Sequence, residues 1–162
     1  MTLHQKLIEN GIFIATAESL TAGLLGSELA KAAGASNFFL GGIIAYQDEV
    51  KQSLLGVDAE LLSHNTAVDA EVAIQMAESI RARFARDCSR KIEQVIGVST
   101  TGVAGPDAVG EHPVGQVFIG VASVRGARAI ELKLSGTRDE IRTESIAAAL
   151  SALEDEIHLL LG

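Results

Sequence analysis

The 162-residue sequence is poor in several features that each indicate a particular class of protein. It has one cysteine, Cys88, so no disulfide can form within the chain, and its four histidines are not spaced as metal ligands. Tryptophan is absent and aromatic residues make up 4%, which removes the stacking surfaces used to bind single-stranded nucleic acids. We therefore expect neither a disulfide framework nor a bound metal or other cofactor.

Positive charge and long apolar runs are also in short supply. Lysine and arginine number 13 against 21 aspartate and glutamate residues, a net charge of −8, which disfavours nucleic acids and anionic membranes as partners. No apolar run approaches the ~18 residues of a membrane-spanning helix. The N-terminal residues also lack the basic start and apolar core of a signal peptide. We expect a soluble cytoplasmic protein, and the sequence leaves open whether it forms a homo-oligomer.

The sequence instead contains a regular succession of apolar segments. Apolar residues make up 48% of the chain, and no repeat or linker divides it, so we expect a single domain over residues 1–162. Residue spacing predicts, in order, a helix at 3–10, a strand at 12–15, a helix ending before Gly34, a strand at 38–46, helices at 48–55 and 69–84, strands at 94–98, 116–123 and 129–134, and a long C-terminal helix after the capping box at 137–140.

The apolar pattern of individual strands predicts their place in the sheet. Segment 116–123 is apolar throughout, which is typical of a central strand, whereas the alternation in 129–134 is typical of a strand near a sheet edge. We predict an α/β fold, a mixed β-sheet covered by helices in α/β/α layers.

Four polar segments interrupt the apolar pattern, and each follows a predicted strand. They are 17–23, within a predicted turn that starts at Thr16; 46–51; 101–115, within a predicted glycine-rich loop; and 135–142. In open α/β sheets ligands bind beyond the strand ends. We therefore expect the four segments to converge on one crevice.

Each candidate residue in these segments also has a purely structural interpretation. Ser19 or Thr21 could cap the helix that follows. The others could be an ordinary strand-end tyrosine, a solvated lysine and a solvated helix face: Tyr46, Lys51, and Arg138 with Arg142. The segment that begins at Thr101 is neither a Walker A loop nor a GxGxxG motif. Residue chemistry alone thus predicts an α/β protein with a candidate anion site.

Several short motifs occur in the order found in one protein family. They are Ala17-Glu18-Ser19-Leu20-Thr21-Ala22-Gly23, Gly41-Gly42-Ile43-Ile44-Ala45-Tyr46 followed by Lys51, Thr101-Gly102-Val103-Ala104-Gly105-Pro106, Pro113-Val114-Gly115 and Ser135-Gly136-Thr137-Arg138. On these motifs the chain resembles the CinA C-terminal domain family, from about Leu7 to the last helix. The resemblance implies a stand-alone member without the N-terminal domain of some relatives. The implied activity is that of a nicotinamide-nucleotide amidase, which converts nicotinamide mononucleotide to nicotinate mononucleotide and ammonia in pyridine-nucleotide recycling.

The resemblance also implies a catalytic group. It makes Ser19 the nucleophile. No histidine is suitably placed, and a desolvated lysine, Lys51, is the available base that removes its proton. Tyr46 would relay that proton or orient Lys51.

A second implied group would bind the charged parts of the substrate. Thr101 and the backbone amides from Gly102 to Gly105 would hold either the oxyanion or the phosphate, and the two roles are not separated. Arg138, at the start of the last helix, would bind the phosphate, with Arg142 one turn further on as support.

The chain departs from the family pattern close to these motifs. Leu20 and Ala22 replace a cysteine and a glycine, Ala108-Val109 replaces a glycine pair, His112 replaces a lysine, and Thr66-Ala67-Val68-Asp69 replaces Gly-Ala-Val-Ser, although Asp69 can still cap its helix. A Cβ at a position that needs a positive φ would move the backbone donors of the site.

Two hypotheses of function follow. The first is a metal-independent amidase whose partner is a small nucleotide; the five retained residues, Ser19, Tyr46, Lys51, Thr101 and Arg138, favour it. The second is a catalytically degenerate paralogue that binds a nucleotide or a protein. The altered glycine positions favour this second hypothesis.

Overall fold

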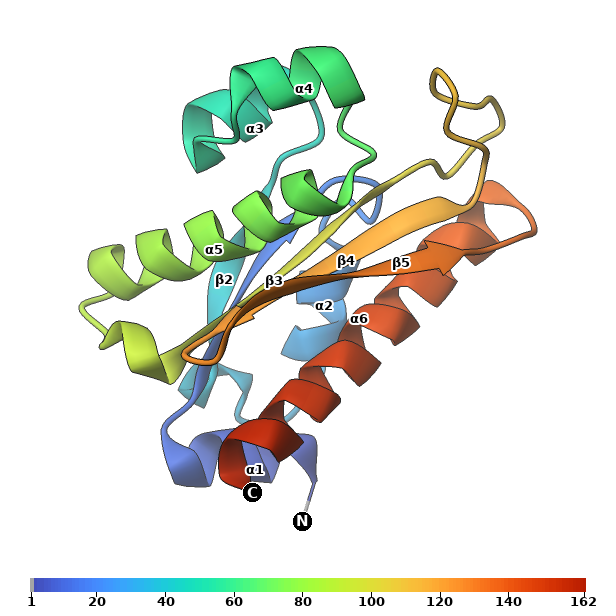
Figure 1. Cartoon of the computed structure of the whole chain (residues 1–162). Coiled ribbons are helices and arrows are strands. Elements are labelled where there is room, and N and C mark those ends of the chain that lie inside the picture. Colours follow the sequence, from blue (N-terminus) through green and yellow to red (C-terminus); the bar gives the residue numbers. More distant parts are fainter. Residues whose placement is uncertain (1) are drawn as a thin grey trace.

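A five-stranded sheet in the order β2-β1-β3-β4-β5 forms the centre of the molecule (Figure 1). The computed structural model describes residues 2–162. Its strands are β1 (Phe13–Glu18), β2 (Phe39–Ile44), β3 (Val95–Gly102), β4 (Gln116–Ser123) and β5 (Gly126–Lys133). Its helices are α1 (Leu3–Asn10), α2 (Leu24–Ala30), α3 (Asp48–Leu55), α4 (Ala59–Asn65), α5 (Ala70–Asp87) and α6 (Arg138–Leu161), with short 3-10 helices η1 (Ala35–Asn37) and η2 (Ile92–Gln94).

The strand directions bring four strand ends to one edge of the sheet. β1 pairs in parallel with β2 and with β3, whereas β4 is antiparallel to both β3 and β5. β5 therefore runs in the same direction as β1, β2 and β3, and the carboxyl ends of these four strands share an edge. The predictions of a central strand at 116–123 and an edge strand near 129–134 are confirmed.

Helices cover both faces of the sheet, which confirms the predicted α/β/α layers (Figure 1). One buried apolar cluster joins α1, α2 and α6 to the sheet and includes Leu7, Ile14, Leu25, Ile96, Ile119, Ile141 and Leu153. A second joins α3, α4 and α5 to the other face and includes Ala15, Ala17, Leu55, Leu62, Val72, Met76 and Ile80. None of the helices among residues 2–162 has the length and apolar character needed to cross a membrane.

Helix α5 lies directly on the sheet at two glycines. A Cβ on Gly97 would meet the carbonyl oxygen of Ala77 at 2.0 Å, and one on Gly120 would meet that of Ala73 at 2.2 Å. The Ser99 hydroxyl donates to the same Ala73 carbonyl at 2.6 Å. These contacts fix the height of α5 above the sheet, and so the position of the segment that leads into it.

β1 and β3 extend beyond their predicted carboxyl ends, β5 begins three residues earlier than predicted, at Gly126, and α4 is not predicted at all. β1 continues to Glu18 through the expected turn, and β3 continues to Gly102 through the start of the expected loop. Polar side chains usually indicate exposed loops, but Glu18, Thr100 and Thr101 are buried with hydrogen-bond partners inside the protein. α4 spans seven residues, too few to show a helical period.

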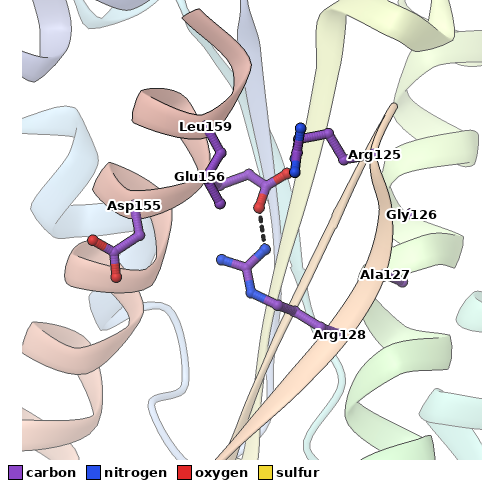
Figure 2. Close-up of a pocket in the computed structure, with 7 residues that line it drawn as sticks. All are labelled: Arg125, Gly126, Ala127, Arg128, Asp155, Glu156 and Leu159. Carbon is purple, nitrogen blue, oxygen red and sulfur yellow. Dashed lines mark hydrogen bonds and ion pairs between the residues drawn. The ribbon is translucent and has the colours of Figure 1, made fainter. Parts of the chain in front are cut away.

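A buried carboxylate ties the β4–β5 hairpin to α6 (Figure 2). Glu156 is 1% exposed and accepts hydrogen bonds from the Ser123 hydroxyl and the Arg128 guanidinium. Burial by itself raises the pKa of the Glu156 carboxyl, but the bonds from Ser123 and Arg128 outweigh burial and hold this pKa below its usual value. The ionised form of Glu156 is therefore the one that stabilises the fold.

We expect Glu156→Gln to lower the free energy of unfolding by about 1–3 kcal/mol at neutral pH, because the amide bonds the two donors less well. The pKa is depressed in the folded state, so this stabilisation is present above the unfolded value of about 4.3 and is lost as the pH falls through the folded value. Urea titrations between pH 7 and 3 should show the two proteins converging at the acid end. The exposed Glu154→Gln is the control, and a gap for Glu156→Gln that stays constant with pH would contradict the prediction.

Candidate active site

Chain segments from both halves of the sequence meet in a cavity of about 380 Å³ at the shared carboxyl edge of the sheet. All four polar segments contribute to its lining, as expected from their positions after strands. Their lining residues include Ser19, Tyr46, Lys51, Thr101, Gly102, Gly105 and Arg138. A further wall comes from α4 and the residues after it: Leu62, Thr66, Ala67 and Val68. Sequence reasoning indicated that residues 66–68 lie near the site, but it missed α4 and Leu62.

Ser19 occupies the turn that follows β1. Its N–H donates to the carbonyl of Thr100 at 2.9 Å, and its own carbonyl accepts from the N–H of Ala22 at 3.1 Å. The N-cap residue of α2 is Gly23, which has no side chain with which to bond the free N–H groups of the first turn. The interpretation of Ser19 or Thr21 as the helix cap is therefore wrong, and the Ser19 hydroxyl is left to the cavity.

The carboxylate of Glu18 takes over the capping of α2. It is 2% exposed and accepts from the N–H groups of Leu25 at 2.8 Å and Gly26 at 3.0 Å, both in the first helical turn. It also accepts from the Thr21 hydroxyl at 2.7 Å, and that hydroxyl contacts the hydroxyl of Thr100 at 2.8 Å. An anion at a helix N-terminus satisfies otherwise unpaired donors. Glu18 thus holds both ends of the turn that carries Ser19.

Arg142 fixes the same turn from α6 and does not line the cavity. Its Nε donates to the carbonyl of Leu20 at 2.9 Å and its Nη2 to that of Thr21 at 3.5 Å. Its Nη1 lies 3.6 Å from the carboxylate of Asp139. The expected support of a phosphate by Arg142 is not what the geometry shows, because its guanidinium is turned to the backbone behind Ser19. A single sequence gives the spacing of Arg138 and Arg142 but not these directions.

The carbonyl oxygen of Tyr46 brings Ser19 and Lys51 together. The Ser19 hydroxyl donates to it at 3.5 Å, the outer limit of a hydrogen bond, and the Lys51 amine donates to it at 2.9 Å. The phenol of Tyr46 points elsewhere and accepts from Arg138 at 2.8 Å. Of the two roles implied for Tyr46, this geometry favours orienting Lys51, and it does so through the main chain.

Lys51 is a buried lysine. Its side chain is 1% exposed, and it is held in α3, which begins two residues after Tyr46. Burial lowers the pKa of the Lys51 amine, and the nearby carboxylate of Asp48 partly opposes that shift. A lysine in such surroundings loses its proton more readily than one in water. The interpretation of Lys51 as a solvated helix residue is therefore wrong.

Thr101 lies in the cavity wall with its hydroxyl turned to the protein. The hydroxyl donates to the carbonyl of Ala67 at 2.6 Å, and the side chain is 1% exposed. Thr101 thus joins β3 to the segment between α4 and α5. Its role toward an oxyanion or phosphate stays a prediction.

The loop after β3 supplies backbone donors and a contact for Arg138. Within residues 2–162, the N–H groups of Ala104 and Gly105 have no hydrogen-bond partner, and both residues line the cavity. Arg138 donates from Nη1 to the carbonyl of Gly105 at 2.5 Å, in addition to its bond to Tyr46. Its guanidinium keeps further N–H groups for a ligand. Donors for an anion are therefore present at this end of the cavity.

Two of the altered glycine positions keep a glycine-like backbone. Ala22 has φ 48° and Thr66 has φ 62°. The hydroxyl of Thr66 accepts a hydrogen bond from the N–H of Val68. The turn at Ser19 is thus formed with Ala22 in place.

His112 bridges the loop to α4, with its ring nitrogens 3.3 Å from the carbonyl of Asn65 and 2.9 Å from the side-chain oxygen of Gln116.

Two acidic residues of the cavity, Asp48 and Asp107, are also missed by sequence reasoning. Nothing in their local pattern distinguishes them from surface carboxylates; only their place in the cavity lining, and for Asp48 the contact with Lys51, does so. No cluster of three or more histidine, cysteine or carboxylate side chains suited to a metal ion occurs within residues 2–162.

Fold and site together define a three-layer α/β protein with a serine and a buried lysine at the carboxyl edge of its sheet. The chain matches the family model of the CinA C-terminal domain over residues 1–157. It therefore belongs to the CinA C-terminal domain family, which confirms the resemblance drawn from the motifs.

Individual relatives support the same assignment. A competence-damage inducible protein of Desulforamulus reducens is 39% identical over 158 residues, which cover 98% of this chain and 36% of the relative. One from Bacillus cereus (strain AH187) is 43% identical over 148 residues, 88% of this chain and 34% of the relative. The chain thus spans about a third of the length of these curated relatives, at 36% and 34%.

Solved structures share the fold over nearly the whole chain. The crystal structure of competence damage-inducible protein A from Klebsiella pneumoniae has a TM-score of 0.85 at 26% identity, covering 96% of this chain and 92% of that chain. That of a competence/damage inducible protein from Agrobacterium tumefaciens has a TM-score of 0.82 at 30% identity, covering 93% and 91%.

We expect Glu18→Ala to lower the free energy of unfolding by about 2–4 kcal/mol, because it leaves the N–H groups of Leu25 and Gly26 without their acceptor and removes one of the two partners of the Thr21 hydroxyl. Glu28→Ala, on the exposed side of α2, removes the same charge and a surface pair with Lys31, which should cost less than about 1 kcal/mol. Urea unfolding followed by circular dichroism compares the two. Equal losses in both variants would show that Glu18 contributes no more than a surface carboxylate.

Proposed function

We propose that the protein hydrolyses the carboxamide of nicotinamide mononucleotide to nicotinate mononucleotide and ammonia. The observation that carries this proposal is the convergence of the Ser19 hydroxyl and the buried Lys51 amine on the carbonyl of Tyr46, inside a cavity that also contains Arg138. A serine paired with a lysine of lowered pKa is a recognised nucleophile and base. Membership of the family supports the substrate assignment.

The chemistry proceeds through an ester of Ser19. Neutral Lys51 takes the Ser19 proton as Oγ attacks the carboxamide carbon, and the carbonyl electrons move to its oxygen. Collapse of this intermediate breaks the carbon–nitrogen bond, and the proton on Lys51 goes to the leaving ammonia. Water then attacks the ester while Lys51 takes its proton, and that proton returns to Ser19 as the acid leaves. The sum is amide plus water to acid plus ammonia.

The charges around the cavity suit this substrate. Its pyridinium ring is cationic and its phosphate anionic, and the cavity is lined by the carboxylates of Asp48 and Asp107 as well as by the Arg138 guanidinium. The unpaired N–H groups of Ala104 and Gly105 are available to a developing oxyanion or to the phosphate.

Ammonia release from nicotinamide mononucleotide by the purified protein tests the proposal. We expect Ser19→Ala to lower turnover at least roughly a hundredfold with an unchanged melting temperature, because the nucleophile is lost while the fold does not use its hydroxyl. Ser27→Ala, an exposed serine of α2, is the matched control and should be as active as the wild type.

Lys51→Arg tests, in the same assay, whether Lys51 acts as the base. It keeps the positive charge but supplies no base near neutral pH, so turnover should be lost while the mononucleotide still binds. Normal turnover in Ser19→Ala or Lys51→Arg would sink the proposed mechanism. Binding by the wild type without ammonia release at any pH would favour the alternative, a nucleotide-binding module in which the altered Leu20, Ala22, Ala108 and Val109 surroundings prevent catalysis.

For Arg138→Ala we expect a loss of affinity for the mononucleotide of about 1.5–3 kcal/mol, because a charge-assisted bond to phosphate is removed. Calorimetry with the corresponding nucleoside should show little difference between variant and wild type, since the nucleoside has no phosphate. Arg86→Ala, an exposed arginine at the far end of α5, controls for net charge. An unchanged affinity for the mononucleotide would move the phosphate to the amides after Thr101.

A further inference from the structure

Lys51 has a charged neighbour that takes no part in the proton transfers of the proposed mechanism. The carboxylate of Asp48 lies 3.5 Å from the Lys51 amine, one turn earlier on α3. The Asp48 side chain is 51% exposed and lines the cavity, whereas Lys51 is 1% exposed. The pair therefore joins a carboxylate that is open to the cavity to an amine that is closed to solvent.

The two partners of the Lys51 amine, the Tyr46 carbonyl and the Asp48 carboxylate, depend differently on its charge. The Tyr46 carbonyl accepts a hydrogen bond from either form of the amine, because both carry N–H groups, although the bond from the ammonium is the stronger. Asp48 favours only the ammonium, because the attraction requires two opposite charges. Asp48 is thus the charged neighbour whose attraction is lost altogether when Lys51 becomes neutral.

The other ionisable groups of this region do not form an ion pair with Lys51. The carboxylate of Glu18 caps α2, and Arg138 binds Gly105 and the phenol of Tyr46. Asp107 lines the cavity from the loop after β3, and Glu49 lies on the exposed side of α3. Within residues 2–162, Asp48 is the one carboxylate within ion-pair distance of Lys51.

We propose that Asp48 is a positioning residue that holds Lys51 as an ammonium in the empty cavity and thereby fixes the lowest pH at which the site turns over. The inference rests on the proposed function, because it assigns a rate to the neutral form of Lys51. Asp48 contacts the base and needs no contact with the reacting atoms.

The direction of the effect follows from the two opposing influences on Lys51. Burial lowers the pKa of its amine and Asp48 raises it, so Asp48→Asn leaves burial unopposed and lowers the pKa further. The neutral fraction at a given pH then increases, and the acidic limb of the rate profile moves to lower pH. The maximal rate at high pH falls, because a less basic amine is a weaker proton acceptor.

The first test is the pH dependence of turnover in wild type and Asp48→Asn. We expect the acidic limb to move down by about one pH unit, the lower end of the range for a charge within 4–6 Å, because Asp48 is half exposed. One unit below the wild-type midpoint, the variant should then retain a share of its own maximal rate about fivefold larger than the share that the wild type retains. Asp48→Glu keeps the charge and should restore the wild-type limb.

Glu49→Gln is the matched control. It removes the same charge from the same first turn of α3, one residue further on, and Glu49 is exposed without a contact to Lys51. The acidic limb of the Glu49→Gln rate profile should stay within about a tenth of a pH unit of the wild-type limb, since an exposed charge beyond contact is largely screened by salt. Equal shifts in Asp48→Asn and Glu49→Gln would overturn the proposal in favour of a general charge effect.

The second test does not depend on activity. The chain has five lysines, Lys6, Lys31, Lys51, Lys91 and Lys133, so the side-chain carbon signals of lysine-labelled protein can be followed by NMR through a pH titration, with Lys51→Arg assigning the Lys51 signal. We expect the Lys51 midpoint to fall by about one unit in Asp48→Asn and to stay in place in Glu49→Gln. An unmoved midpoint in Asp48→Asn overturns the proposal. A moved midpoint in a protein that releases no ammonia would instead reject the proposed function and retain the coupling of Asp48 to Lys51.

Discussion

The carboxylate of Glu18, almost without solvent contact, accepts three hydrogen bonds at the point where β1 ends and α2 begins. A buried anion is tolerated only where donors surround it, and here the donors belong to the backbone and the hydroxyl of the next eight residues. These bonds therefore hold together the two ends of the turn that carries Ser19. Arg142 then fixes the outer side of that turn from α6, so that a strand, a helix start and the last helix all meet behind a single hydroxyl.

Much of the fold follows from the sequence, because apolar periodicity reports which side of each element is buried. The order of elements, the central position of β4 and the edge position of β5 were all predictable in this way. The ends of β1 and β3 were not, because Glu18, Thr100 and Thr101 are polar residues whose partners come from distant parts of the chain. α4 was not predictable because seven residues, about two turns of helix, carry too little pattern, and with it the part of the cavity wall formed by Leu62 was missed.

The candidate site was predictable as a set of segments and residue types, and less so as a set of contacts. Strand ends and family motifs indicated Ser19, Lys51 and Arg138, and the structure places all three in one cavity. The directions of Arg142 and of the Thr101 hydroxyl are set by backbone carbonyls, which have no signature in the sequence. The neighbour of Lys51 on its own helix, Asp48, is visible in the sequence only as one more acidic residue.

Tyr46 spans the site with a single residue, since its carbonyl holds Ser19 and Lys51 and its phenol holds Arg138. The distance between the Ser19–Lys51 pair and Arg138 is therefore set by the covalent geometry of Tyr46 rather than by packing. Substitution can remove the phenol and uncouple Arg138, but every amino acid at this position supplies the carbonyl. The pairing of the serine with the lysine is thus sheltered from single mutations at Tyr46, whereas the distance from that pair to the arginine is open to evolutionary change.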